Sequence, residues 1–204
     1  MGGRFALGNY FKFGYLSTNI EYGTFFKNAV LKQNAFVFNT VFFTNLLETG
    51  KWKFRQFVKT EFIIGNNRFD SNADKLTLNR DYGIQGFNNT LIFGTKKFLA
   101  TFQTQSYSPR NVYGFRLNPF LNYTMGLLGN PSNGFKTSRL YSQLGLGLII
   151  TNDYLVFSSF QISFSYFPSI PGDGNSIFKT NAFQTDDFGL QNFEIAKPLL
   201  VPYQ

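Results

Sequence analysis

The chain has 204 residues, among them 28 Phe and 11 Tyr, and 43% of its residues are hydrophobic but only 15% are charged. It contains no Cys and no His, which excludes thiolate nucleophiles, disulfides, Cys/His zinc sites and Ser-His-Asp triads. The net charge of +8 is compatible with nucleic acid, an anionic membrane surface or basic residues facing water in a channel. Aromatic residues fit a pleated sheet, so an all-β fold is the first expectation.

The first third of the chain predicts three strands. Residues 10–26 and 33–47 alternate imperfectly between apolar and polar side chains. Residues 52–64 alternate regularly: one face carries the apolar side chains, and the other carries charges at Lys53, Arg55, Lys59 and Glu61. The basic residues Lys51, Lys53, Arg55 and Lys59 could also form a nucleic-acid stripe with the nearby aromatic residues, but positions that face the interior of a barrel explain the charges equally well.

Residues 66–95 break the strand pattern, and we expect them to form a long loop that folds inward between two strands. Asp70, Ser71, Asn72, Asp74 and Asp81 have a spacing that resembles a calcium loop. Lys75 stands where the sharp turn of such a loop needs Gly, so a solvated polar loop is the preferred interpretation.

The strands after this loop show the clearest alternation. Tyr113, Leu117, Leu121 and their neighbours form a wholly apolar face, opposite a polar face that includes Arg116, Asn118 and Asn122. The expected strands are residues 98–105, 112–128, 140–152 and 154–167, with a last one within 183–203. The whole chain therefore predicts about eight strands.

The composition of the two faces favours a transmembrane barrel over a soluble β-sandwich. A sandwich would place acids and lysines on its solvent face, whereas the polar face here is mainly Ser, Thr, Asn, Gln and Gly. An apolar exterior with aromatic residues near the strand ends and a polar interior is typical of transmembrane barrels. No run of 18 or more apolar residues predicts a membrane helix.

The segment Ile84, Gln85, Gly86, Phe87 resembles a motif of the bacterial surface-antigen superfamily of outer-membrane barrels, of the BamA and TpsB (two-partner-secretion) type. That motif is Val/Ile-Arg-Gly-Phe/Tyr and lies in a loop that folds into the barrel. The strands that follow are similar to the family's layout, and the chain is most similar to versions from the Bacteroidetes lineage. The resemblance covers residues 76–204 well and the earlier strands only by pattern.

Two departures from the family pattern occur together. Gln85 replaces the motif arginine, and Asn122 stands where the resemblance implies an aspartate partner on the barrel wall. A neutral amide pair keeps a hydrogen bond without the cost of an unpaired buried charge. We therefore expect Gln85 to lie near the polar face that carries Arg116, Asn118 and Asn122, with Asn122 as its partner.

The expected fold is an all-β antiparallel transmembrane β-barrel, of which the chain is the C-terminal half of a roughly 16-stranded barrel. The chain opens without the pattern of a signal peptide, which favours a fragment. The resemblance implies a non-enzymatic protein of the bacterial outer membrane that acts in outer-membrane protein assembly or polypeptide translocation, or anchors a fused secreted domain. The expected partners are outer-membrane lipid, polypeptide substrates and barrel-assembly subunits, with no nucleic acid, cofactor or metal.

Two alternatives remain open at this point. The chain could form a small closed barrel with a passive pore or structural role, whose first and last strands would pair. It could also be a soluble basic β-domain, which would need no detergent.

Overall fold

The computed structural model describes residues 1–28, 30–67, 75–79, 83–152 and 159–184. These residues form ten β-strands and no helix. The strands are β1 (Gly2–Phe11), β2 (Gly14–Lys27), β3 (Val30–Thr44), β4 (Leu47–Thr49), β5 (Trp52–Asn66), β6 (Lys96–Tyr107), β7 (Phe115–Gly129), β8 (Tyr141–Asn152), β9 (Phe160–Ile170) and β10 (Gly174–Gln184). This part of the chain accordingly has no helix long and apolar enough to cross a membrane.

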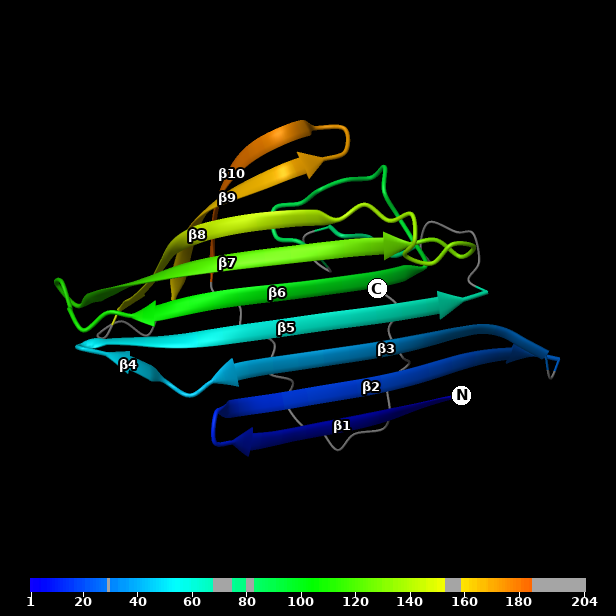
Figure 1. Cartoon of the computed structure of the whole chain (residues 1–204), viewed down its shortest axis with the longest axis horizontal. Helices are drawn as coiled ribbons and strands as arrows, with labels where there is room; N and C mark the ends of the chain where they lie inside the picture. The colour runs from blue at the N-terminus through cyan, green and yellow to red at the C-terminus, as the bar shows by residue number, and fades with distance from the viewer. Residues whose placement is uncertain (29, 68–74, 80–82, 153–158, 185–204) are drawn as a thin grey trace.

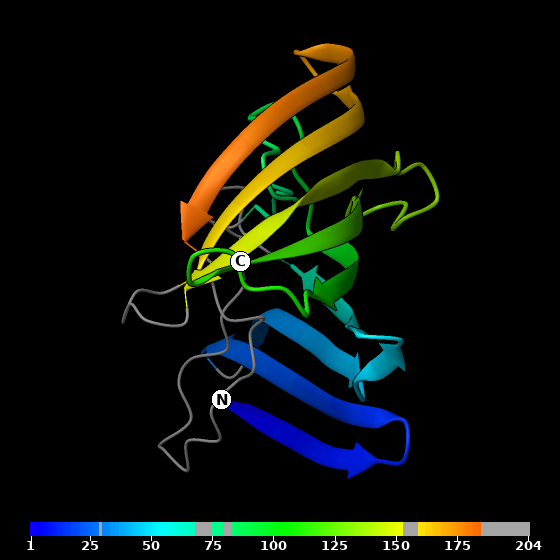
Figure 2. The same ribbon diagram turned by 90° about the vertical axis from the view of Figure 1, so that its left-hand side faces the viewer.

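All the strands belong to one antiparallel sheet with the order β1-β2-β3-β5-β6-β7-β8-β9-β10, and the short β4 pairs with β5. The sheet is curved, and β1 and β10 lie at its opposite edges (Figures 1 and 2). Among the described strands β1 pairs only with β2 and β10 only with β9. The fold resembles a barrel wall, but the sheet is not closed.

The two edge strands run in the same direction. The path from one edge to the other contains nine strands, and the direction reverses at every step because each pairing is antiparallel. β1 and β10 therefore cannot pair with each other as antiparallel neighbours. Closure of an all-antiparallel barrel requires an odd number of further strands between these edges.

The all-β antiparallel fold expected from the sequence is confirmed, whereas the expected count of about eight strands is too low. β1 was missed because its glycines weaken the alternation, and β4 because three residues are too few to show a period. β10 was missed because neither of its alternate residue sets is uniformly apolar. The strand expected within residues 183–203, like Tyr154 at the start of another, lies largely outside the described residues.

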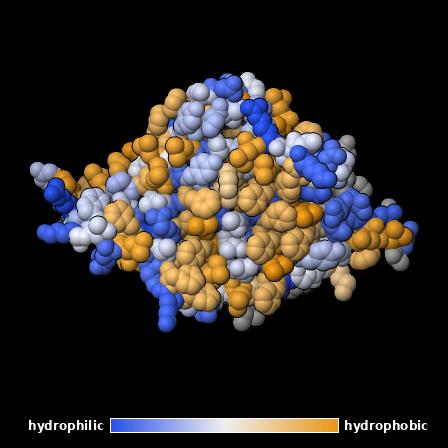
Figure 3. All heavy atoms as spheres, in the orientation of Figure 1, coloured by the Kyte–Doolittle hydropathy of each residue, from blue (hydrophilic) through white to orange (hydrophobic). Residues whose placement is uncertain are grey.

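The two faces of the sheet differ sharply in composition. The convex face, turned toward the viewer in Figure 3, is apolar over the central strands and hydrophilic at both strand ends. Its side chains are about half exposed, as for Leu146 at 57% and Ile162 at 45%. The opposite, concave face carries buried polar side chains, among them Asn122, Gln143 and Ser165.

Two glycines of β8 make room for this crowded concave face. A Cβ atom at Gly145 would overlap the side chains of Asn122 and Gln143. A Cβ at Gly147 would overlap the backbone oxygen of Ile162 and lie 2.7 Å from the ring of Phe120. Small residues at these positions therefore allow neighbouring side chains to lie flat across the sheet.

We predict that Gly147→Ala destabilises the sheet, because the backbone of β9 cannot yield without loss of strand pairing. Overpacking of this kind costs about 1–3 kcal/mol. The matched control is Gly3→Ala in β1, where an added Cβ meets nothing within 4 Å. The measurement is the urea midpoint of the detergent-folded chain by circular dichroism, and equal midpoints for the two variants would contradict the prediction.

Candidate functional site

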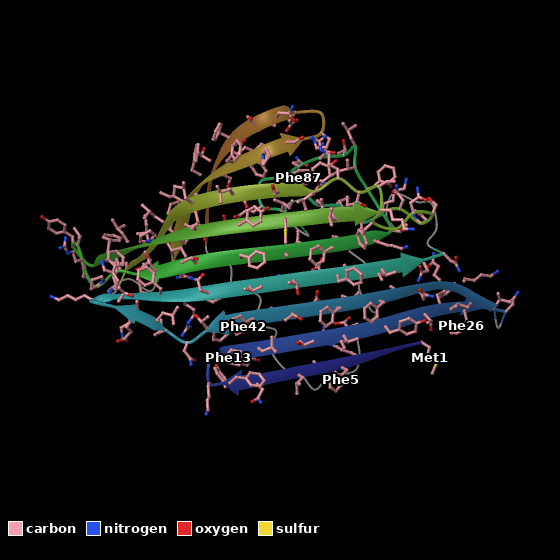
Figure 4. The ribbon with its side chains drawn as sticks, in the orientation of Figure 1. Met1, Phe5, Phe13, Phe26, Phe42 and Phe87 are labelled. Atoms are coloured by element: carbon pink, nitrogen blue, oxygen red, sulfur yellow. The ribbon has the colours of Figure 1, made fainter. Side chains whose placement is uncertain are left out.

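The candidate site is the concave face together with the loop between β5 and β6. The described parts of this loop, residues 75–79 and 83–95, pack against the inward side of the sheet. Figure 4 labels Phe87 of the loop near β8 and β9, far from Phe5 and Phe13 at the β1 edge. The described loop therefore lies over the concave face next to β8 and β9, and it also reaches Val37 of β3 and Ile63 of β5 through Leu76.

Four loop residues have no exposed surface. Leu76 packs against Val37 and Ile63 of the sheet, and the other three are Leu78, Ile84 and Phe87. These three form a single apolar cluster with four residues of the sheet and the strand ends, namely Leu99, Tyr141, Phe167 and Ile170. The ring of Phe87 lies 5.7 Å from the ring of Tyr141 in an edge-on contact and 6.5 Å from that of Phe167. Aromatic pairs in this geometry add to the stabilisation that comes from burial alone.

The sheet offers a recess for the loop at Gly126 of β7. An added Cβ there would lie 2.7 Å from Cδ2 of Leu78 and 3.3 Å from Cδ1 of Leu99. Within the loop, Gly86 has φ of 78°, a conformation that glycine adopts without strain. The Gly86-Phe87 pair therefore turns the chain so that the ring enters the apolar cluster.

Hydrogen bonds also stabilise this loop, both within it and to the neighbouring strands. The side-chain oxygen of Asn89 accepts hydrogen bonds from the backbone of Leu91 and Ile92, and its amide donates to the carbonyl of Pro171. The ammonium of Lys179 on β10 donates to the carbonyl of Gly86 at 3.2 Å. Leu76 and Gly94 also pair as an isolated antiparallel bridge.

The motif residues predicted from sequence have distinct places in this arrangement. Ile84 and Phe87 are fully buried, whereas Gln85 is half-buried and makes no hydrogen bond within the described part of the chain. The backbone carbonyl of Gly86 accepts the hydrogen bond from Lys179. The loop is thus fastened by apolar side chains and backbone groups on either side of Gln85.

The predicted wall residues are all on β7 and make contacts within the sheet. The carbonyl oxygen of the Asn122 side chain accepts from Gln143 at 3.3 Å. Asn118 accepts from the backbone of Ser108 at 2.9 Å, and Arg116 is exposed near the end of the strand. The described residues show no hydrogen bond between Gln85 and Asn122, so the expected proximity of these two side chains stays a prediction.

Several anchors of the loop were not predicted from the sequence. Leu78, Asn89 and Lys179 lie far apart in the chain, and their types are common in ordinary loops and strands. The only local signal was Asn89, since Asn side chains often bond to backbone amides a few residues ahead. The residues proposed for a calcium loop between Asp70 and Asp81 lie outside the described residues, except Lys75.

Charges on the concave face are mostly paired. Lys97, with no exposed surface, contacts the carboxylate of Glu61 at 2.6 Å. At the other side of the sheet Arg4 lies 3.3 Å from Glu21, and Asn19 bonds to both of these side chains. Such pairing offsets the cost of removing a charge from water.

Over the described ranges, no group of three or more Asp, Glu, His or Cys side chains could hold a metal ion. The side chains brought together are amides, hydroxyls and paired ions, which hold a segment against a wall. Comparison of the chain with protein-family models, curated proteins and solved structures finds no match.

We predict that Phe87→Ala releases the loop from the wall. Removing a fully buried Phe costs about 3–5 kcal/mol, and the loss falls on the loop contacts. The measurement is the rate of limited proteolysis between residues 75 and 95 in detergent, which should rise strongly. Leu91→Ala is the control, because Leu91 is 65% exposed, and a similar rise for both variants would argue against the anchor.

A second prediction concerns the buried ion pair. Lys97→Met leaves the Glu61 carboxylate without its cation and should lower the free energy of unfolding by about 3 kcal/mol. Lys53→Met is the matched control, since Lys53 and Glu48 are 52% and 62% exposed and such pairs contribute under about 1 kcal/mol. Urea unfolding of both variants measures the difference, and equal losses would show that burial of the pair is unimportant.

Proposed function

We propose that the chain forms part of the wall of a transmembrane β-barrel of surface-antigen type in the bacterial outer membrane. Its convex face contacts lipid, and its concave face with the packed loop faces the lumen. The proposed role is non-enzymatic: assembly of outer-membrane proteins, translocation of polypeptide, or anchoring of a fused secreted domain. The resemblance around Ile84 to Phe87 supports the family, and the two faces of the sheet support the membrane.

The observation that carries the proposal is the uncovered apolar convex face. Leu121, Leu144, Leu146, Leu148, Ile162 and Phe164 are each between 38% and 57% exposed on neighbouring strands. Contiguous apolar surface of this extent is unfavourable in water and is typical of sites that face lipid or a partner. The outward positions of β7, β8 and β9 carry no charged residue.

Strand length and aromatic placement agree with a membrane wall. β5 and β7 have 15 residues each, and a tilted membrane strand needs about 9–11 residues. Phe13 and Phe42 lie together at one end of the first strands, with ring centroids 5.8 Å apart, and Phe26 lies at the other end (Figure 4). Aromatic side chains near both ends suit the two interfaces of a bilayer.

The alternatives raised by the sequence fit these features less well. A soluble sandwich buries its apolar face under a second sheet, and the described residues form a single sheet. A small closed barrel whose first and last strands pair is not formed by the described strands, because β1 and β10 are separate edges that run in the same direction. A wall segment that is completed by further strands accounts for both observations.

The test uses arginine substitutions on the two faces. Leu146→Arg and Ile162→Arg should block stable insertion into lipid vesicles, because a cation near the midplane of a lipid face costs roughly 2–4 kcal/mol. The measurement is the fraction of chain that resists urea extraction after refolding into phosphatidylcholine vesicles.

Gln161 of the concave face is only 7% exposed, so an arginine at this position would be crowded. Gln103→Arg is the better control, since Gln103 lies on the concave face of β6 and is half-buried. Equal losses for Leu146→Arg and Gln103→Arg would overturn the assignment of the faces. A wild-type chain that stays in detergent-free buffer as a monomer would overturn the membrane proposal itself.

A further inference from the structure

The concave face of β5 carries two cations, Arg55 and Lys59, that stand apart from the paired charges described above. Both side chains point to the same face because the two residues are four positions apart along a strand. Their Cα atoms are about 13 Å apart at the usual rise of a strand. Phe57 lies between them on the same face.

Neither cation has an acidic partner in the part of the chain that the structure describes. The nearest carboxylate along the strand is Glu61, and Lys97 already occupies it at 2.6 Å. Among the described residues Lys59 has no hydrogen-bond or ion-pair partner, and the buried Nε atom of Arg55 has no hydrogen-bond partner. By contrast, Arg4 and Lys179 each lie within 4 Å of a carboxylate.

The strands on either side of β5 add polar groups but no acid. The inward positions of β6 opposite this row are Thr101, Gln103 and Gln105, and those of β3 are Asn39, Val41 and Phe43. Gln103 pairs with Phe57, so on the neighbouring strand it lies level with the middle of the row, between the positions opposite Arg55 and Lys59. Amide groups donate hydrogen bonds to an anion without competing charge.

The ring of Phe43 holds Arg55 in place. The guanidinium carbon lies 5.1 Å from the centre of that ring, within the range of a cation–π contact. A stacked guanidinium keeps its N–H donors in the plane of the group, where they can donate paired hydrogen bonds to carboxylate or phosphate oxygens. Arg55 is thus oriented before any anion arrives.

We propose that the row formed by Arg55, Gln103 and Lys59 binds an elongated solute with an anionic group at each end. Arg55 takes one anionic group, Lys59 takes the other, and the amide of Gln103 bonds to the segment between them. The inference rests on the proposed function only in placing this row in a lumen. It assigns to that lumen a preference for anionic over cationic solutes.

The test is isothermal titration of the full chain in a non-ionic detergent with two probes. Sodium tripolyphosphate presents phosphates and nonanedioate presents two carboxylates, so the two titrations distinguish the kinds of anion. We expect saturable binding of at least one probe. Arg55→Gln and Lys59→Gln should each weaken it about tenfold, because each removes one charged hydrogen-bond donor.

Lys51→Gln is the control, since Lys51 is an exposed cation in the turn before β5 and outside the row. Lys59→Arg keeps the charge and should keep binding, which separates loss of charge from loss of folding. Absence of saturable binding of either probe, or an equal loss in Lys51→Gln, would overturn the inference. Failure of vesicle insertion with intact probe binding would overturn the membrane proposal and leave this site standing.

Discussion

The alternation of side chains along each strand is the constraint on which the other features depend. A strand that is apolar on one side and polar on the other must have different surroundings on its two sides. In a single curved sheet the convex side has no partner layer, so its leucines and phenylalanines remain exposed within the described structure. The concave side is crowded instead, because curvature brings the inward side chains of neighbouring strands together.

Crowding on the concave side explains both the glycines and the loop. Because Gly145 and Gly147 have no side chains, those of Asn122 and Phe120 can lie across β8. Gly126 likewise leaves space for the side chain of Leu78 from the loop. The loop in turn covers apolar residues such as Leu99 and Phe167 that would otherwise face an open polar space. The packing of the inward loop and the packing of the concave face of the sheet therefore depend on each other.

Charge on the concave face is distributed in two ways. Beneath and beside the loop, Lys97 and Glu61 form a tight pair, as burial requires. Away from the loop, Arg55 and Lys59 lack such partners in the described chain. The chain has 19 basic and only 11 acidic residues, so its acids are too few to pair with every cation.

The sequence by itself determined the all-β class, the long strands β5, β7 and β8 and the assignment of their faces, because alternation is a local property of consecutive residues. It also predicted that Ile84 and Phe87 lie in an inward loop. The tertiary structure alone decided that Phe87 meets Tyr141 and Phe167, that Lys97 finds Glu61, and that the edges β1 and β10 stay apart. These contacts join residues distant in the chain, and they depend on register, curvature and the number of strands, none of which a period of two residues can specify.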